Sequence, residues 1–181
     1  MSNNYNSEKR NRHSIRLKNY DYSRTGIYFI TICTNENEYL FGKIKDQQMI
    51  LNDAGKILEK IWNEMQTYYI TIKTDVFQIM PDHFHGIVII RGKDAYENYY
   101  NNNDLPNLSL SDVVKNYKTL TTKLYTDGVK DGIFEPYNQR LWQHNFWDYI
   151  IRTDEELKQI RQYIINNPKK EHKKGIEEYD F

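Results

Sequence analysis

Met80-Pro81-Asp82-His83-Phe84-His85-Gly86, followed directly by Ile87-Val88-Ile89-Ile90, is the stretch on which the fold of this chain depends. The apolar run is β-branched throughout and follows turn-forming residues, so it predicts a buried strand. Because side chains alternate along a strand, His83 and His85 should share one face and Phe84 should point to the other. The Cα atoms of the two histidines would lie about 6.6 Å apart, which lets both imidazoles reach one metal ion.

A His-x-His pair is weak evidence for a metal site when it stands alone. Two ligands do not complete the coordination shell of a metal ion, so further ligands must come from elsewhere in the chain. Histidines at this spacing are equally compatible with exposed or locally hydrogen-bonded side chains. The remainder of the sequence therefore has to decide between the two interpretations.

Length and composition indicate one ordinary soluble domain. A chain of 181 residues is long enough to bury a core. Its formal net charge of zero excludes a global field that recruits DNA or membranes, so nucleic-acid binding would need local patches. The single cysteine, Cys33, excludes an internal disulfide and predicts a buried thiol in a reducing compartment. No run of 18 apolar residues and no apolar signal core occurs, so we expect a cytoplasmic protein without membrane contact.

The N-terminal region is polar and basic, and we expect residues 1–14 to form a flexible tail. The cationic side chains up to residue 24 are Lys9, Arg10, Arg12, Arg16, Lys18 and Arg24. They predict either a solvated tail or an arm that follows a phosphate backbone, with Tyr20 and Tyr22 available to stack on bases.

The middle of the chain predicts a sheet with helices. The expected elements are a central strand at 27–34, a hairpin of 40–45 and 48–51, a helix from the N-cap Asn52 to about Thr67, and a strand at 70–79 before the histidine strand. Residues 91–108 predict an exposed loop.

The next helix should begin at Ser109 or Ser111. Its expected apolar stripe is Val113, Val114, Tyr117, Leu120 and Leu124, and its other face carries Lys115, Lys118, Thr119, Thr121, Thr122 and Lys123. Such a polar face is either solvated or in contact with phosphates.

A final helix should begin with Thr153 as N-cap and Glu156 at N3, which is the capping-box pattern. It should end at Asn167, because Pro168 disfavours helical backbone at the residue before it. Tyr163 and Asn167 are four residues apart and therefore share a face of this helix. Residues 171–181 predict a C-terminal tail.

Several short motifs occur together in one order along the chain. They are Tyr20-Asp21-Tyr22-Ser23, Leu40-Phe41-Gly42, Leu51-Asn52-Asp53-Ala54-Gly55, the histidine motif, Tyr117-Lys118-Thr119-Leu120, Trp142-Gln143, Ile150-Ile151-Arg152 and Tyr163-Ile164-Ile165-Asn166-Asn167-Pro168. This ordered set resembles the REP-associated tyrosine transposases, which are single-tyrosine members of the HUH nuclease class. The similarity places the transposase domain at residues 15–170.

The resemblance implies an α+β fold of the ferredoxin-like or RRM-like kind, with an antiparallel β-sheet, helices packed on one face and the catalytic tyrosine on the C-terminal helix. It implies a metal-dependent transposase or endonuclease that cleaves and rejoins single-stranded DNA beside hairpin (REP-like) sequences. The intermediate would be a 5′-phosphotyrosine with a free 3′-hydroxyl. The partner would be single-stranded or hairpin DNA, and the protein would act as a monomer or homodimer.

The resemblance also implies residue roles. Tyr163 maps to the nucleophile, and His83, His85 and Asn167 map to ligands of a divalent cation, Mg²⁺ or Mn²⁺. Asp82 can orient an imidazole, contact the ion or shape the turn, and Asn166 is a further candidate for supporting the ligands. A cation at this place would neutralise the anionic phosphate, and a tyrosine ester would store the bond energy for rejoining.

The DNA-binding candidates are Arg12, Arg16, Lys18, Tyr20, Tyr22, Lys115, Lys118, Lys123, Trp142 and Arg152. Two positions depart from the family pattern: His144 stands where an arginine is expected, and Tyr149 stands where a histidine is expected. Both departures concern DNA contacts or proton transfer near the tyrosine helix, and the core chemistry does not depend on them.

Three other interpretations compete with a transposase. A domesticated or inactive relative would bind hairpin DNA without cleaving it. A metal-dependent hydrolase with His-x-His on a strand, as in amidohydrolase barrels, would need roughly 250 residues and further His or Asp strand motifs. A purely structural module would bind no metal.

Overall fold

The computed structural model describes residues 21–91 and 108–170. The predicted tails at 1–14 and 171–181, and nearly all of the predicted loop at 91–108, lie outside those residues. Among the helices of the described part, none combines the length and the apolar character needed to cross a membrane.

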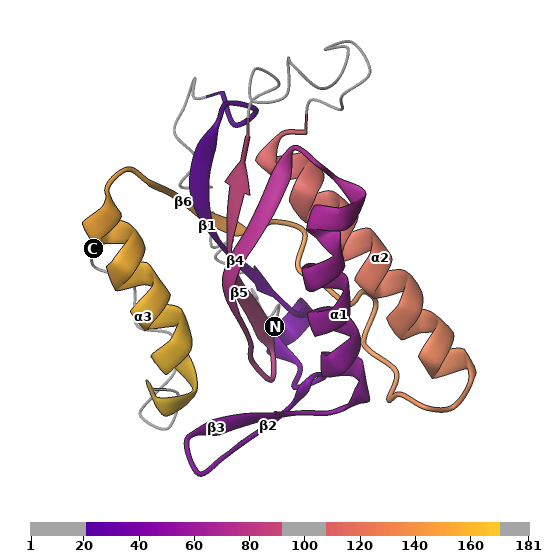
Figure 1. Ribbon diagram of the computed structural model, residues 1–181. Coiled ribbons are helices and arrows are strands. Elements are labelled where there is room, and N and C mark those ends of the chain that lie inside the picture. Colours follow the sequence, from indigo (N-terminus) through magenta and orange to yellow (C-terminus); the bar gives the residue numbers. More distant parts are fainter. Residues whose placement is uncertain (1–20, 92–107, 171–181) are drawn as a thin grey trace, which may run out of the picture.

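The described residues form a four-stranded antiparallel sheet in the order β4-β5-β1-β6 (Figure 1). The strands are β1 (Gly26–Cys33), β4 (Ile72–Ile79), β5 (His83–Ile90) and β6 (Trp147–Ile151). The two central strands, β1 and β5, are the β-branched, apolar runs of the sequence, as expected for strands buried on both faces. This arrangement confirms the predicted α+β class and its antiparallel sheet.

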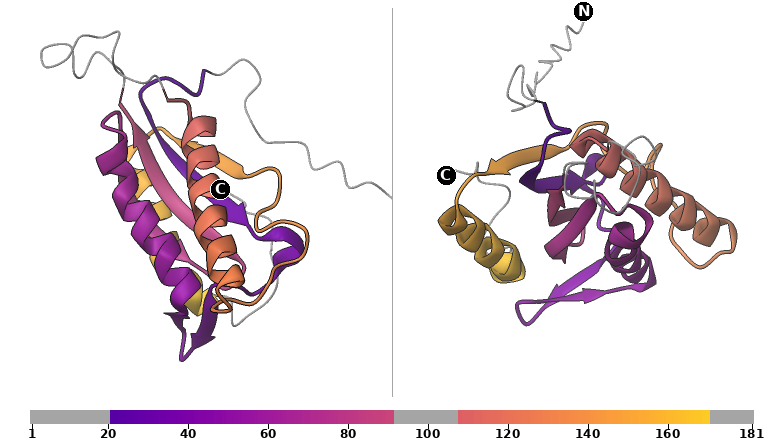
Figure 2. Two further views of the ribbon diagram at one scale, coloured as in Figure 1. Left: turned by 90° about the vertical axis from the view of Figure 1, so that its right-hand side faces the viewer. Right: turned by 45° about the horizontal axis from the view of Figure 1, so that its top comes forward.

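Helices cover both faces of the sheet. Helices α1 (Asp53–Tyr68) and α2 (Leu110–Lys130) lie side by side on one face, which we call the α1/α2 face (Figures 1 and 2). Helix α3 (Asp154–Lys170) lies on the other, the α3 face. The expected packing of helices on one face therefore holds for α1 and α2. Helix α3, which carries Tyr163, packs on the opposite face.

Each helix begins at a side chain that accepts a backbone N–H. Asn52 Oδ1 accepts from Gly55 N at 2.9 Å, Ser109 and Asp112 form a reciprocal capping box, and Thr153 Oγ1 accepts from Glu156 N at 3.1 Å. These bonds satisfy donors that have no partner inside the helix. The helix starts predicted from the sequence are therefore confirmed.

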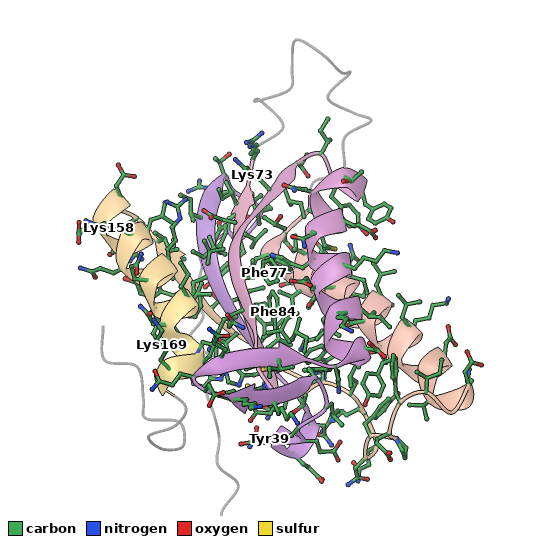
Figure 3. All side chains as sticks on the ribbon, turned by 60° about the horizontal axis from the view of Figure 1, so that its bottom comes forward. Tyr39, Lys73, Phe77, Phe84, Lys158 and Lys169 are labelled. Carbon is green, nitrogen blue, oxygen red and sulfur yellow. The ribbon has the colours of Figure 1, made fainter. Side chains whose placement is uncertain are left out.

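The main core lies between the sheet and the α1/α2 face. Trp62 packs on Phe84 with ring centroids 4.7 Å apart and on Tyr117 at 5.4 Å, and Figure 3 shows Phe84 and Phe77 between the sheet and α1. A Cβ atom on Gly86 would lie 2.7 Å from the Phe84 ring and 2.8 Å from the Trp62 ring. Glycine is therefore needed where the histidine motif passes under this aromatic cluster.

A small hairpin stands apart from the main sheet. It consists of β2 (Gly42–Lys45) and β3 (Gln48–Leu51), and it projects away from the rest of the molecule (Figure 2). A short 3-10 turn, η1 (Asn35–Asn37), links β1 to the segment before this hairpin. The expected hairpin is thus present: β3 has the predicted bounds, and β2 begins at Gly42 instead of Leu40.

Two local predictions were wrong. Helix α3 continues through Pro168 to Lys170, because a missing proline N–H in the last turn removes only one hydrogen bond. The apolar stripe of α2 does not include Leu124, which is 40% exposed, whereas Thr121 and Tyr125 are buried. Thr121 can be buried on a helix because its hydroxyl donates to the Tyr117 carbonyl at 2.8 Å.

Candidate functional site

The turn before β5 is held by backbone and side-chain hydrogen bonds. The Asp82 carbonyl accepts from Thr34 N at 2.8 Å and from Thr34 Oγ1 at 2.9 Å. The Pro81 carbonyl accepts from the backbone N–H groups of Leu40 and Phe41. Both histidines therefore enter the sheet from a rigid turn rather than from a loose loop.

The two histidines point their ring edges at each other from the α3 face. Their Nε2 atoms lie 3.1 Å apart. His83 Nδ1 lies 2.6 Å from the Asp82 carboxylate, and His85 Nδ1 lies 2.8 Å from Thr31 Oγ1. A carboxylate only accepts hydrogen bonds, so Nδ1 of His83 carries the proton and Nε2 of the neutral ring carries the lone pair.

Burial keeps the inner histidine neutral. His85 is fully buried, whereas the side chains of His83 and Asp82 are 15% and 14% exposed. Desolvation, and to a smaller extent the neighbouring charge of His83, hold the pKa of His85 well below its usual range. A neutral imidazole is the form that binds a metal ion.

Tyr163 on α3 lies against this pair within the same chain. Its ring centroid is 5.5 Å from that of His85 and 6.0 Å from that of Phe29. One turn further along the helix, the buried Asn167 donates from Nδ2 to the Tyr163 hydroxyl at 2.9 Å. The structure therefore brings His83, His85, Tyr163 and Asn167 into one cluster.

Helix α3 is placed on the sheet by a small apolar patch and an ion pair. Ile160 and Ile164 pack on the α3 face of the sheet. Arg161 donates from Nε to Asp75 Oδ2 at 3.1 Å, and a second guanidinium nitrogen contacts the same oxygen. Asp75 lies where the β4–β5 register shifts between Thr74 and Phe77, so this irregularity aims the carboxylate at the helix.

The donor atoms fit a divalent cation. Two cis ligands of an octahedral ion, each at about 2.1 Å, lie about 3.0 Å apart, which matches the 3.1 Å between the two Nε2 atoms. The N–H group of Asn167 is used by the tyrosine, so its amide oxygen is the available donor. In the described part of the chain no group of three or more His, Cys, Asp and Glu side chains could hold an ion. Asn167 as a third ligand stays a prediction of the sequence.

The predicted DNA-binding residues fall into three groups. Arg12, Arg16, Lys18 and Tyr20 lie outside the described residues. Lys115, Lys123 and Arg152 are exposed, as phosphate contacts require. Tyr22, Lys118 and Trp142 are engaged inside the protein.

Trp142 is the clearest correction among these candidates. It is 5% exposed, and its indole N–H donates to Thr121 Oγ1 at 2.9 Å. The prediction that Trp142 contacts DNA is therefore wrong, because its ring belongs to the core. Tyr22 is half-buried and packs on Tyr28 with ring centroids 5.9 Å apart.

Lys118 supports a loop instead of facing solvent. Its Nζ donates to the carbonyl oxygens of Gln143 at 2.9 Å, His144 at 3.4 Å and Asn145 at 3.0 Å. Burial lowers the pKa of its ammonium to about 8. The expected phosphate contact by Lys118 is corrected to a structural role.

The remaining sequence candidates have local partners. Asn166 accepts from Lys169 Nζ at 3.2 Å on the surface of α3. Tyr149 donates to Glu156 Oε1 at 3.2 Å, and desolvation together with that carboxylate raises its pKa. His144 is exposed, and Cys33 is half-buried rather than buried as predicted.

Sequence reasoning missed Trp147 and Arg140. Both line a hollow whose wall also includes Thr31 and Cys33, the strand partners of His85 and His83. Side chains alternate along a strand, so Trp147 shares a face with Tyr149 and Ile151 of β6. The sequence could therefore have placed Trp147 on this face once the bounds of β6 were known.

Comparison with known proteins gives one relative in sequence and a similar fold in solved structures. No family model matches the chain. An "Uncharacterized protein" of Haemophilus influenzae is 36% identical over 176 residues, which cover 93% of this chain and 94% of that protein.

Among solved structures, the fold is similar to a REP-associated tyrosine transposase bound to a REP hairpin. The TM-score is 0.55 at 16% identity, over 86% of this chain and 73% of that one. A putative transposase from Deinococcus radiodurans has a TM-score of 0.49 at 15% identity, over 83% of this chain and 95% of that one. The chain thus has a transposase-like fold, and it belongs to the same family as the Haemophilus influenzae protein.

Proposed function

We propose that this protein is a metal-dependent enzyme that cleaves and rejoins single-stranded DNA beside hairpins through a covalent bond to Tyr163. The observation that carries the proposal is the cluster of His83, His85 and Tyr163, with Nε2 atoms 3.1 Å apart and the tyrosine ring 5.5 Å from that of His85. The transposase of similar fold was solved bound to a REP hairpin, which supports DNA of this kind as the substrate.

A divalent cation, Mg²⁺ or Mn²⁺, held by His83, His85 and Asn167 would neutralise the scissile phosphate and orient it. The Asp82 carboxylate holds His83 in the tautomer that presents Nε2, and Thr31 Oγ1, 2.8 Å from His85 Nδ1, orients the second imidazole. Asn167 orients the tyrosine hydroxyl through its own N–H. The protein thus supplies a positioned nucleophile and two positioned ligands.

In the first step, the Tyr163 oxygen attacks phosphorus and the bond between phosphorus and the 3′-oxygen breaks. The phenolic proton passes to solvent, and the departing 3′-oxygen takes up a proton to become a hydroxyl. The 5′-phosphate remains esterified to the tyrosine. In the reverse step, a second 3′-hydroxyl attacks this ester, which forms a new phosphodiester and releases the tyrosine without ATP.

One chain contains every side chain that this chemistry uses. Tyr163 and the histidines meet within a single protomer, so the proposal does not require a partner subunit to contribute the nucleophile. A monomer suffices, and a homodimer would hold two such sites.

The test is the covalent intermediate. Incubation of the protein with a labelled hairpin carrying a single-stranded flank, in Mg²⁺ or Mn²⁺, should give a protein–DNA band that resists SDS. Tyr163→Phe removes one oxygen and should abolish the band while hairpin affinity stays within about twofold. Tyr68→Phe is the matched control, because Tyr68 is exposed on α1. A band from Tyr163→Phe would assign the nucleophile to another tyrosine.

Substrate form provides a separate measurement on the same proposal. Gel shifts should favour the flanked hairpin over a blunt duplex of equal sequence, and affinity should fall as salt rises. Preferential hairpin binding without any covalent band would instead support an inactive hairpin-binding relative.

A further inference from the structure

A hollow of about 350 Å³ has Thr31 and Cys33, the strand partners of His85 and His83, in its wall. Thr31 of β1 pairs with His85 on one side and with Trp147 of β6 on the other. Adjacent strands are about 4.8 Å apart, so the Cα atoms of His85 and Trp147 are separated by about 10 Å. Stacked nucleotides of one strand rise about 3.4 Å each. A strand with its phosphate at the histidines therefore reaches this hollow within about three nucleotides.

One wall of the hollow is aromatic. Trp147 is 39% exposed, whereas Trp62 and Trp142 are buried in the core. Phe146 is half-buried beside it. An exposed indole inside a hollow offers a flat surface on which an unpaired base can stack.

The lining of the hollow also includes a positioned cation. Arg140 is exposed, and its Nε donates to Asn35 Oδ1 at 3.1 Å. Asn35 is buried and donates from Nδ2 to the Asn138 carbonyl at 3.0 Å, so the residue that holds the arginine is itself held. The nearby carboxylate of Glu36 accepts from Asn138 Nδ2 at 3.0 Å. The guanidinium is thus oriented before any ligand arrives.

The loop that closes the hollow is also held in advance. Lys118 Nζ donates to the carbonyl oxygens of residues 143–145 and lies 5.9 Å from the centre of the Phe146 ring. A site whose walls are ordered before binding loses less conformational entropy when a ligand enters.

We propose that this hollow binds one unpaired nucleotide of the DNA strand, with its base on Trp147 and a phosphate on Arg140. The assignment rests on the proposed function, which it deepens by naming the residues that hold the single-stranded flank. An aromatic face beside a guanidinium is the combination that binds a base and its phosphate. A volume of 350 Å³ falls in the range of small-ligand sites, about 300–1,000 Å³, so the hollow takes one nucleotide and not a duplex.

The experiment measures binding without cleavage. Hairpins with a randomised single-stranded flank are selected for affinity in EDTA, and the tightest is remade with one abasic position at a time. In the wild type, one abasic position should weaken binding by about 5- to 100-fold. Trp147→Ala should lose that position-specific penalty. Tyr39→Ala, which removes an aromatic side chain that is 71% exposed elsewhere, should keep it.

Two additional variants keep the test informative if Trp147→Ala folds poorly. Trp147→Phe retains a stacking ring, so it should keep the abasic profile but lose the quenching of tryptophan fluorescence on DNA binding. Arg140→Ala should weaken binding of the selected hairpin more than Lys43→Ala, a matched exposed cation on β2. An unchanged abasic profile in Trp147→Ala, or unchanged quenching in Trp147→Phe, would overturn the assignment.

The outcomes separate this inference from the proposed function. A position-specific profile without any covalent band on addition of Mn²⁺ would leave the hollow as a nucleotide site and reject the tyrosine chemistry. A covalent band together with an unchanged profile in Trp147→Ala would reject the nucleotide site and leave the chemistry.

Discussion

The two faces of the sheet differ in what they bury. The α1/α2 face is covered by two helices over a continuous aromatic core that includes Trp62, Phe84 and Tyr117. The α3 face has a small apolar cluster of five buried residues, Phe29, Ile87, Ile151, Ile160 and Ile164, next to the two histidines. Strand β5 serves both faces, with Phe84 on one and His83 and His85 on the other. The α1/α2 face therefore supplies most of the apolar burial, whereas the α3 face carries the polar side chains of the two histidines.

The difference shows that His83, His85 and Tyr163 lie outside the face that supplies most of the apolar burial. Helix α3 is attached by few apolar side chains and one ion pair, so the position of Tyr163 depends on contacts that contribute little to the main core. Substitutions on the two faces should therefore separate stability from chemistry.

The largest effect should come from Phe84→Ala on the α1/α2 face. Removing this fully buried ring should lower the free energy of unfolding by about 3–5 kcal/mol, because a cavity is left among large side chains. Urea denaturation followed by circular dichroism measures the change. Under conditions where the variant remains folded, Mn²⁺ affinity should equal that of the wild type. Loss of Mn²⁺ affinity with little loss of stability would contradict the division between the faces.

The second effect concerns His83 and His85, the proposed metal ligands on the α3 face. His83→Ala removes a ligand, so Mn²⁺ affinity measured by isothermal titration should fall by more than the 10- to 100-fold loss typical of removing a ligand's supporting partner. Unfolding free energy should change by less than about 1 kcal/mol, as for most sites outside the core. The control is His144→Ala, which alters an exposed histidine. Equal Mn²⁺ affinity of the wild type and the double variant of His83 and His85 would reject the pair as ligands.

The third effect concerns the attachment of α3. Asp75→Asn breaks the ion pair with Arg161, whose side chain is 42% exposed, so the loss of global stability should be about 1 kcal/mol or less. The rate of covalent-band formation should fall by more than the factor of about five to which 1 kcal/mol corresponds. The reason is that the helix that carries Tyr163 is loosened. The exchanged pair Asp75→Arg with Arg161→Asp should recover part of the rate. Glu64→Gln, which breaks the Lys60–Glu64 surface pair, should leave the rate unchanged; an equal loss there would contradict a positioning role.

The smallest effect concerns Lys118 and pH. Its pKa of about 8 in the folded protein is below the ordinary value of 10.5 because burial disfavours the ammonium. Between these two values the unfolded chain binds more protons than the folded one, so the free energy of unfolding should rise with pH in that window. The gain should be well below the roughly 3 kcal/mol to which the full shift corresponds, because Lys118 is partly exposed and solvent screens its charge.

The Lys118 effect is measured as a difference between proteins, since other groups titrate in the same range. Urea unfolding at pH 7 and pH 10 should show a smaller rise for Lys118→Met than for the wild type. Lys115→Met, at an exposed position one turn earlier, should behave as the wild type does. The same pH slope in all three proteins would show that burial of Lys118 does not influence stability.

The sequence by itself determined the elements and the partition of β5 between two faces. Alternation put His83 and His85 together because a strand has a period of two, and side-chain caps located the helix starts because Asn52, Ser109 and Thr153 act on neighbouring backbone. The spacing of Tyr163 and Asn167 predicted their contact, because residues four apart on a helix are neighbours. These are local rules, so the sequence is sufficient for them.

The tertiary structure alone decided which chain segments meet. Three contacts join distant positions of the chain. Thr31 contacts His85 across 54 residues, and Asp75 contacts Arg161 across 86. Lys118 supports residues 143–145, about 26 residues further along the chain. Trp142 and Trp147 are both tryptophans in one aromatic-rich segment, and only packing buried the first and exposed the second. Such pairings depend on how strands and helices are ordered in space, and no short-range pattern encodes that order.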